Sequence, residues 1–289
     1  MSIYKKITIV VVTYNSENQI QKLLLSLHLI NKIIGEIIIV DNNSRNFDRK
    51  KIENLNNKIK IIQNKQNLGF AKAVNQGIKK SKKNFILLLN PDTYLINNSI
   101  SKTFNLIKKN KKIGVVGGQI KYPNNNLYPT ANSRPTFLTG LFEFTNLKKI
   151  FPKNKYSKNF WIENIKKINK PIRVSSLCGA YLIFRRKINN KLNLFNEDFF
   201  MYMEDIDFGI KNNKEGYEVI FDPNSEIIHI GGASSKNRYK TALKYWYRSR
   251  KIFFKKNLEP PKGIILSLLF TLEEVVLKIY HCIKNEPYE

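Results

Sequence analysis

Short apolar runs alternate with helix-like stretches through the first half of the chain. Runs rich in β-branched residues predict strands at 7–13, 36–41, 58–63, 84–89 and 113–118. The stretches between them predict helices at about 17–30, 46–56, 69–81 and 97–110. Strands that are apolar on both faces and alternate with helices are typical of a parallel sheet covered by helices. The pattern therefore predicts an α/β fold with a mostly parallel central sheet.

The regular pattern fades in the middle of the chain and returns later. Residues 122–171 are rich in Pro, Asn and Lys with scattered aromatic residues, which predicts a long excursion over the open edge of the sheet. An apolar strand is expected at 176–184. The acidic stretch 196–207 then leads into a helix that ends near Gly216, and a last strand at 217–222 precedes His229.

The C-terminal segment differs in composition from the rest. Residues 236–256 contain nine Lys or Arg and no acid, interleaved with aromatic residues, and Pro260 and Pro261 then interrupt the chain. The apolar stretch 263–280 is shorter and more charged than a bilayer span requires. Two interpretations stay open: a helical pair that packs on the core, or a helical extension that lies on an anionic membrane surface.

The net charge narrows the possible partners only in part. Lys and Arg total 50 against 22 Asp and Glu, so the formal charge of +28 favours anionic partners. A basic nucleic-acid-binding α/β protein without catalytic activity is the alternative that this charge supports. Against it, no helix-turn-helix or zinc module is visible, and the Lys, Asn and Ile excess is also what biased codon usage produces.

Cysteine usage and the first strand exclude other classes. Cys178 and Cys282 are the only cysteines and lie far apart in sequence, so no disulfide framework is expected and a reducing cytoplasm fits. The apolar run 7–12 is too short for a signal peptide. A nucleotidyltransferase would need a glycine-rich loop after the first strand, and residues 14–16 provide none.

Acidic side chains follow two of the predicted strands. In open α/β sheets, ligands bind beyond the carboxyl ends of the strands. Asp41 ends one strand and precedes Asn42, Asn43 and Ser44, which would also make an ordinary turn or helix cap. Asp92 follows the predicted strand 84–89, where it is either a turn residue or a ligand for a divalent cation.

Two further groups can carry chemistry later in the chain. Glu204, Asp205 and Asp207 open a predicted helix after an aromatic run; the helix dipole alone could favour them, but a carboxylate held there can also accept a proton. His229 follows a strand and precedes two glycines, which admit close backbone approach. It is either structural or a metal ligand.

Taken together, seven motifs resemble those of bacterial family-two glycosyltransferases, in particular the rhamnosyltransferase-like group that acts on cell-surface polysaccharides. The resemblance spans about residues 5–250 and rests on VVTYNSENQI, VDNNS, NLGFAKAVNQG, LLLNPDT, CGAYLIFRR, FFMYMEDIDFGIK and HIGGASS. It implies a glycosyltransferase A (Rossmann-like) fold over residues 1–235, followed by the extension 236–289. It also implies a nucleotide-sugar donor, a divalent cation (Mn²⁺ or Mg²⁺) and inversion by single displacement.

The resemblance also implies roles for individual residues. Asp205 corresponds to the catalytic base, with Glu204 supporting it or contacting the acceptor, and Asp92 and His229 correspond to the metal site. Asn90 stands where many relatives have a first acid. The positions implied to bind the donor are Tyr14, Asn15, Asp41, Asn67, Gly69, Phe70, Ala71, Asn75, Asn90 and Asp92.

The implied reaction moves rhamnose or another hexose from a nucleoside diphosphate to a hydroxyl of a surface polysaccharide or lipid-linked glycan. It would take place in the cytoplasm, at the inner face of the membrane if the extension binds there. The chain departs from the family pattern at Val174–Leu177, where relatives often have Val-Asp-Trp, and at Asn196, where an Asp is usual. The identity of the sugar and of the acceptor is therefore left open.

Overall fold

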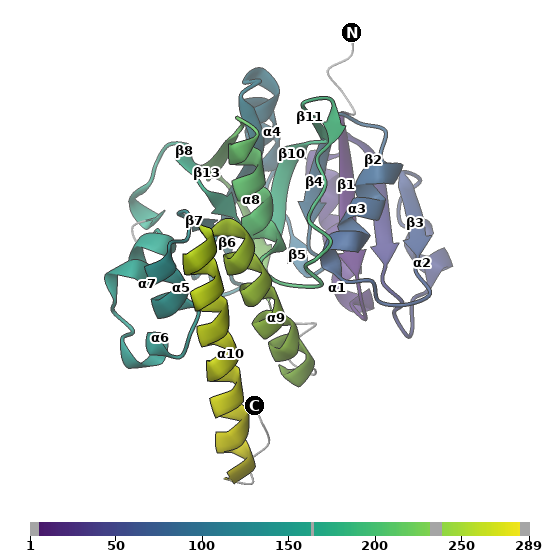
Figure 1. Cartoon of the computed structure of the whole chain (residues 1–289). Helices are drawn as coiled ribbons and strands as arrows, with labels where there is room; N and C mark the ends of the chain where they lie inside the picture. Colours follow the sequence, from purple (N-terminus) through teal and green to yellow (C-terminus); the bar gives the residue numbers. More distant parts are fainter. Residues whose placement is uncertain (1–5, 163–164, 232–238, 284–289) are drawn as a thin grey trace.

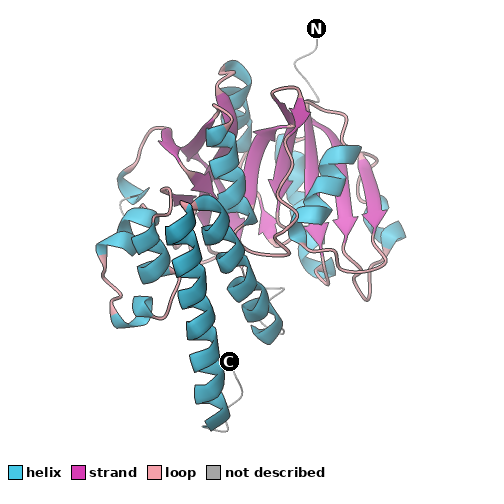
Figure 2. Ribbon diagram, in the orientation of Figure 1, coloured by secondary structure: helices cyan, strands magenta, loops and turns pink. Residues whose placement is uncertain are grey.

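A computed structural model of the chain describes residues 6–162, 165–231 and 239–283. A twisted sheet forms the body of the molecule, helices cover both of its faces, and two long helices extend from one end (Figures 1 and 2). The main sheet has the strand order β3-β2-β1-β4-β10-β6-β13-β5, with β8 paired beside β13. The α/β class and the C-terminal helices predicted from the sequence are confirmed.

The first four strands are parallel and lie where the sequence predicts them. They are β1 (Ile7–Thr13), β2 (Ile34–Asp41), β3 (Ile59–Gln63) and β4 (Phe85–Leu89). The chain moves outward from β1 to β3 and then returns to place β4 on the other side of β1. This reversal creates a switch point between β1 and β4, and in open α/β sheets such a point is where ligands bind.

Helices bury the apolar side chains of these strands on both faces. Side chains from α1, α2 and α4 pack on one face, and side chains from α3 and α8 pack on the other. The predicted helix 17–30 becomes α1 followed by a 3₁₀ turn, and the predicted helix 46–56 shortens to α2. The observed bounds are α1 (Glu17–Ser26), η1 (Leu27–Ile30), α2 (Arg49–Glu53), α3 (Phe70–Lys80), α4 (Ile100–Lys109) and α8 (Glu204–Lys214).

The expected strand 176–184 is wrong as a single element. It divides into β9 (Ser176–Leu177) and β10 (Tyr181–Arg185), with a turn between them. Because β9 pairs with the outlying β7 (Ala131–Asn132), the chain must turn before it enters the main sheet. β10 then runs antiparallel to β4 and to β6 (Ile113–Lys121), so the sheet is mixed in its middle.

The last strand is longer than the expected 217–222. β13 (Glu218–His229) runs parallel to β6 and antiparallel to β5 (Thr93–Tyr94) and β8 (Ile172–Val174). Its register on β6 shifts between Asp222 and Glu226, and this irregularity accommodates Pro223. Because β13 continues past this irregularity, it ends at His229. A small hairpin of β11 (Lys187–Ile188) and β12 (Lys191–Leu192) lies apart from the main sheet.

The excursion 122–171 contains several short helices. They are α5 (Phe137–Glu143), α6 (Leu147–Ile150), α7 (Lys155–Phe160) and η2 (Ile165–Lys167). Figure 1 shows α5, α6 and α7 beside the two long C-terminal helices. Aromatic side chains cause this association, because Phe144 and Phe160 pack with Phe254 in a core cluster separate from those of the sheet.

The C-terminal segment forms α9 (Tyr239–Asn257) and α10 (Pro260–Ile283). Pro260 begins α10, a position where the missing N–H and fixed φ of proline suit a helix. Residues 236–238 of the predicted basic helix lie outside the described residues. In the described part of the chain, no helix is both long and apolar enough to cross a bilayer.

Gly69, just before α3, has a backbone conformation that favours glycine. Its φ is +85°, and a Cβ there would lie 2.6 Å from the carbonyl oxygen of Phe200. The same oxygen accepts a 2.7 Å hydrogen bond from the Phe70 amide. Gly69 therefore allows the α3 N-terminus to approach the segment that precedes α8.

We expect Gly69→Ala to destabilise the protein by about 3 kcal/mol, because it adds a steric clash to backbone strain. Gly216→Ala is the matched control: its φ is +87°, but a Cβ added there would have no atom within 4 Å. That variant should lose only about 1 kcal/mol. Urea unfolding of both variants measures the difference, and equal losses would contradict the packing described here.

Candidate active site

The ends of β1 and β2 are joined by hydrogen bonds that link Asn15 and Asp41, two of the residues predicted to bind the donor, through Ser44 and Arg45. The Asn15 amide donates to Ser44 Oγ at 2.7 Å, and the Arg45 amide donates to Asn15 Oδ1 at 2.9 Å. The Ser44 amide donates to Asp41 Oδ1 at 3.2 Å. Asp41 is fully buried, and burial raises the pKa of its carboxyl. Tyr14, half-buried, precedes Asn15 at the same edge.

The loop before α3 is fastened to the same edge. Asn42 Nδ2 donates to Asn67 Oδ1 and to the Gly69 carbonyl, both at 3.1 Å. Asn42 Oδ1 accepts from the Leu68 amide at 3.2 Å. Because Asn42 directly follows β2, its amide holds Asn67 and Gly69 beside Asp41.

Two predicted donor residues on α3 have structural contacts. Ala71 is fully buried in the core beneath the helix. Asn75 donates to the Phe195 carbonyl and to Glu197, both at 2.9 Å, and accepts from the Phe195 amide at 2.8 Å. The Asn75 amide therefore fastens the segment before α8. Phe70, at the start of α3, is partly buried and packs against the same core.

Asp92 and His229 meet across two paired strands. His229 pairs with Thr93 across β13 and β5, and the Ile230 amide donates to the Asp92 carbonyl at 3.0 Å. His229 Nε2 lies 3.1 Å from Asp92 Oδ1 and 3.5 Å from Asn90 Nδ2. Both the aspartate and the imidazole are buried. The structure therefore brings together the two residues expected at a metal site, with Asn90 beside them.

The donor atoms of this pair suit a divalent cation. Two ligands about 2.1 Å from an octahedral ion and at right angles are about 3 Å apart, close to the separation observed here. Carboxylate oxygen suits Mg²⁺ and Mn²⁺, and an imidazole nitrogen beside it favours a transition metal. Within the described residues, no group of three His, Cys, Asp or Glu side chains could hold a metal. The remaining ligands would therefore come from a substrate or from water.

Asp205 lies in the first turn of α8. Its Oδ2 accepts from the Gly179 amide at 2.9 Å, and its Oδ1 accepts from the Ile206 amide at 2.8 Å. Tyr202 and Met203, which lead into the helix, both have positive φ angles, +73° and +68°. Non-glycine residues rarely adopt this conformation, and such strain is found preferentially at functional sites.

A single turn connects Asp205 to the Asp92 edge. The Gly179 amide binds Asp205, and the carbonyl of the next residue, Ala180, accepts from the Asn90 amide at 3.2 Å. Burial raises the pKa of the neighbouring Cys178 thiol to about 12, and the charges of Asp205 and Asp92 both add to the shift. The two backbone hydrogen bonds of Gly179 and Ala180 therefore link the first turn of α8 to the strand end that carries Asn90 and Asp92.

Two other parts of this site were missed in whole or in part. The segment Cys178–Ala180 begins one of the seven motifs, but it was expected within a strand and not as a turn whose backbone contacts both sides. Tyr128, whose ring centre lies 5.2 Å from that of His229, was not singled out at all. Burial raises the pKa of this phenol, and the charges of Cys178, Asp205 and Asp92 add to the effect. Tyr128 comes from an aperiodic stretch, which carries no signal for it.

The three acids of α8 occupy different environments. Burial, together with the charge of Asp205, raises the pKa of Glu204 to about 8, and its Oε2 has no hydrogen-bond partner in the described part of the protein. Burial also raises the pKa of Asp205. Asp207 instead contacts Lys256 at 3.0 Å and Asn257 at 2.9 Å on α9. Asp207 therefore joins two helices, and the other two acids can serve chemistry.

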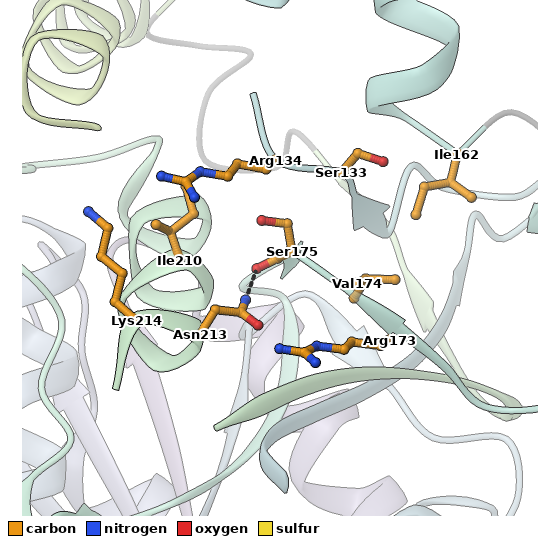
Figure 3. A pocket seen from close by; sticks show the side chains of 9 residues that line it. All are labelled: Ser133, Arg134, Ile162, Arg173, Val174, Ser175, Ile210, Asn213 and Lys214. Atoms are coloured by element: carbon orange, nitrogen blue, oxygen red, sulfur yellow. Dashed lines mark hydrogen bonds between the residues drawn. The ribbon is translucent and has the colours of Figure 1, made fainter. Parts of the chain in front are cut away.

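A separate cavity of about 500 Å³ lies beside the other end of α8 (Figure 3). Ile210, Asn213 and Lys214 of α8 line it, together with residues from β8 and from the segment after β7. Arg134, Arg173 and Lys214 are exposed around it and give it a basic character. None of the predicted site residues lines this cavity, so it is distinct from the strand-end site.

Comparison with known families shows to which family the chain belongs. The model of glycosyl transferase family 2 matches residues 8–192, which is more than half of the chain and includes β1, Asp41, Asp92 and the turn at Gly179. The chain belongs to glycosyl transferase family 2. This membership favours an enzyme over the nucleic-acid-binding alternative.

Two curated relatives have specific activities. An N-acetylglucosaminyl-diphospho-decaprenol L-rhamnosyltransferase of Mycobacterium tuberculosis is 25% identical over 256 residues, which cover 85% of this chain and 82% of the relative. The low-salt glycan biosynthesis hexosyltransferase Agl10 of Haloferax volcanii is 23% identical over 286 residues, which cover 95% of this chain and 85% of the relative. Rhamnosyltransferase resemblance, expected from the motifs, is thus confirmed.

Solved structures support the fold. The crystal structure of GalNAc-T7 with UDP, GalNAc and Mn²⁺ has a TM-score of 0.59 at 16% identity, covering all of this chain and 59% of the other. The crystal structure of Staphylococcus aureus TarS 1–349 in complex with UDP has a TM-score of 0.53 at 20% identity. The match covers 92% of this chain and 70% of the TarS chain. Together with the family match, they confirm the glycosyltransferase A fold.

We expect Glu204→Gln to stabilise the protein at alkaline pH. The pKa of Glu204 in the folded chain, about 8, lies above its ordinary value of 4.5, so its ionisation opposes folding. Stability should therefore fall as pH rises from about 4.5 to 8, and the amide should remove much of that fall. At pH 8 we expect the melting temperature to rise by roughly 4 °C.

Thermal unfolding between pH 5 and pH 8.5 measures the effect. Asp207→Asn is the control, because it weakens the contact with Lys256 and should lower the melting temperature instead. An unchanged pH slope in Glu204→Gln would show that this carboxyl is not forced to titrate at raised pH.

Proposed function

We propose that the chain is an inverting, metal-dependent glycosyltransferase that moves a hexose, such as rhamnose, from a nucleoside-diphosphate sugar to a hydroxyl of a lipid-linked or surface glycan. The observation that carries the proposal is the joint placement of Asp92, His229 and Asp205 at one sheet edge, linked through the turn at Gly179 and Ala180. Family membership supports the reaction class.

The nucleoside of the donor would lie at the ends of β1 and β2. Asp41 and Asn15 are joined there through Ser44 and Arg45, and the loop with Asn67 and Gly69 borders them. The UDP found with two structural neighbours supports a nucleotide in this fold. The diphosphate would then extend along the edge toward Asn90 and Asp92.

The metal would be held by Asp92 and His229. A divalent cation there would supply positive charge opposite the diphosphate oxygens, where negative charge increases as the sugar leaves. The protein residues keep the Asp92 carboxylate and the His229 imidazole close and buried, so little rearrangement is needed on binding. Tyr128 restrains the imidazole ring by packing against it.

Asp205 would act as the general base. An acceptor hydroxyl is a weak nucleophile and needs a carboxylate that removes its proton as the new bond forms. Backbone amides of Gly179 and Ile206 hold both oxygens of Asp205, and its raised pKa increases its affinity for the proton. Because Asp207 is engaged by Lys256, only Glu204 can assist from the same turn.

The relatives' names support the acceptor class. One acts on a diphospho-decaprenol lipid and the other in glycan biosynthesis. A lipid-linked acceptor would place the enzyme at the cytoplasmic face of a membrane, with residues 1–235 as the catalytic part and 236–289 as a membrane-associating extension.

We expect Asp205→Asn to lose about 100- to 10,000-fold in kcat, because the amide cannot accept the proton while it keeps the size of the side chain. Transfer is assayed with a panel of uridine and thymidine diphosphate hexoses, and nucleoside diphosphate binding by calorimetry. Binding should be preserved.

The control for this experiment is Asp198→Asn, an exposed acid just before α8 that should keep full activity. Full turnover by Asp205→Asn would remove Asp205 from the role of base.

A further inference from the structure

The largest exposed apolar surface in the described chain lies on α10. Its side chains are 37 to 65% exposed and comprise Ile264, Ile265, Leu268, Leu269, Leu272, Val275, Val276, Ile279 and Tyr280. At about 100° per residue, they cover an arc of about 160° on one side of the helix. Exposing so much aliphatic surface to water is unfavourable in free energy. The arc therefore indicates a surface that is covered by a partner or a membrane.

The opposite side of α10 is already occupied by the protein. Leu266 and Phe270 are fully buried against α9, where the Arg250 guanidinium lies 4.4 Å from the Phe270 ring centre. Glu273 contacts Arg250 at 2.7 Å, and Glu274 contacts Lys251 at 2.9 Å. Both acids of the helix therefore face inward and are neutralised there.

Cations border the exposed arc. By the same spacing, Lys262 and Lys278 lie at its opposite edges, and each also contacts a glutamate, Glu259 or Glu274. Their long side chains can keep the ammonium groups in the headgroup region while the apolar arc is immersed. Lys262 is balanced by Glu259, whereas Lys278 and Lys251 share the single charge of Glu274, so an excess of positive charge remains at the Lys278 edge.

α6 lies beside α10 and adds exposed apolar side chains. The Asn146 amide donates to Glu273 Oε1 at 2.6 Å, which holds α6 beside α10, as Figure 1 shows. Ile150 and Phe151 are 67% and 51% exposed there. Lys149 and Lys153, next to them, are exposed and have no acidic partner among the residues described.

We propose that the α10 arc, together with Ile150 and Phe151, docks the enzyme on an anionic phospholipid surface. Only the benefit of docking rests on the proposed function, since docking would bring the site to a lipid-linked acceptor. A wide apolar arc bordered by lysines, with Lys149 and Lys153 exposed on the neighbouring segment, suits a helix that lies in a membrane interface. A coiled-coil seam in a second copy of the chain would need a narrower stripe, about two positions in seven.

The surface differs from the one that the sequence suggested. There, the aromatic residues of 236–256 were the candidates for membrane contact. In the structure, Tyr247, Phe253 and Phe254 of α9 are buried, and the Trp246 ring stacks on Phe144 at 5.6 Å. α9 is thus the support that presents α10.

The test is flotation of the full chain with vesicles of equal parts phosphatidylglycerol and phosphatidylcholine, at low salt and without any sugar donor. We expect the wild type to float with these vesicles and only weakly with pure phosphatidylcholine. The triple variant Leu268→Gln, Leu272→Gln, Val276→Gln, at the centre of the arc, should bind at least about tenfold more weakly. Its melting temperature should be unchanged, because these side chains are exposed already.

Matched variants separate the contributions. Leu25→Gln, Leu55→Gln, Ile96→Gln changes three exposed apolar side chains of the N-terminal half and should float like the wild type. Lys149→Gln, Lys153→Gln should reduce the preference for anionic vesicles. Flotation of the α10 triple variant at the wild-type level would overturn the proposal. The proposal would also be overturned if the wild type did not bind vesicles and instead formed a dimer that the triple variant does not form. Because no transfer is measured, either result is independent of the proposed reaction.

Discussion

The pairing of β13 with β5 is the constraint on which the candidate site depends. It places His229 opposite Thr93, and so brings the imidazole within 3.1 Å of the Asp92 carboxylate, although 137 residues separate them in sequence. Two buried polar side chains are thus held together at the carboxyl end of the sheet. Without this pairing, Asp92 and His229 would not be held next to each other.

The turn between β9 and β10 completes the site by connecting that pair to α8. The Gly179 amide donates to Asp205 and the Ala180 carbonyl accepts from the Asn90 amide, so one short backbone segment fixes Asp205 relative to the strand end that carries Asn90 and Asp92. A Cβ at Gly179 would lie 3.3 Å from the Cβ of Asp205, which is tight. The strained residues Tyr202 and Met203 orient the first turn of α8 toward this segment. Geometry at this site is therefore fixed by backbone as much as by side chains.

The sequence predicted the first half of the fold well because β1 to β4 and their helices carry local periodicity. It failed where pairing is nonlocal: the division of 176–184 depends on the partner of β9, and the length of β13 depends on a bulge at Pro223. Asp92, Asp205 and His229 were singled out by their places at predicted strand ends and a helix start, and motif resemblance added their expected roles. The resemblance also selected Asn75, an amide that fastens residues 195–197. Tyr128 was not, because its role depends only on its position beside His229.

The most direct test of the central claim is a crystal structure of the chain with Mn²⁺ and UDP, or dTDP if UDP does not bind, with the ion located by its anomalous scattering. The account predicts one Mn²⁺ bound by Asp92 and His229, with the diphosphate on the same ion and the Asp205 carboxylate facing the adjoining space. An ion bound by neither residue, or a nucleotide in the basic cavity beside Arg134 and Arg173, would contradict it.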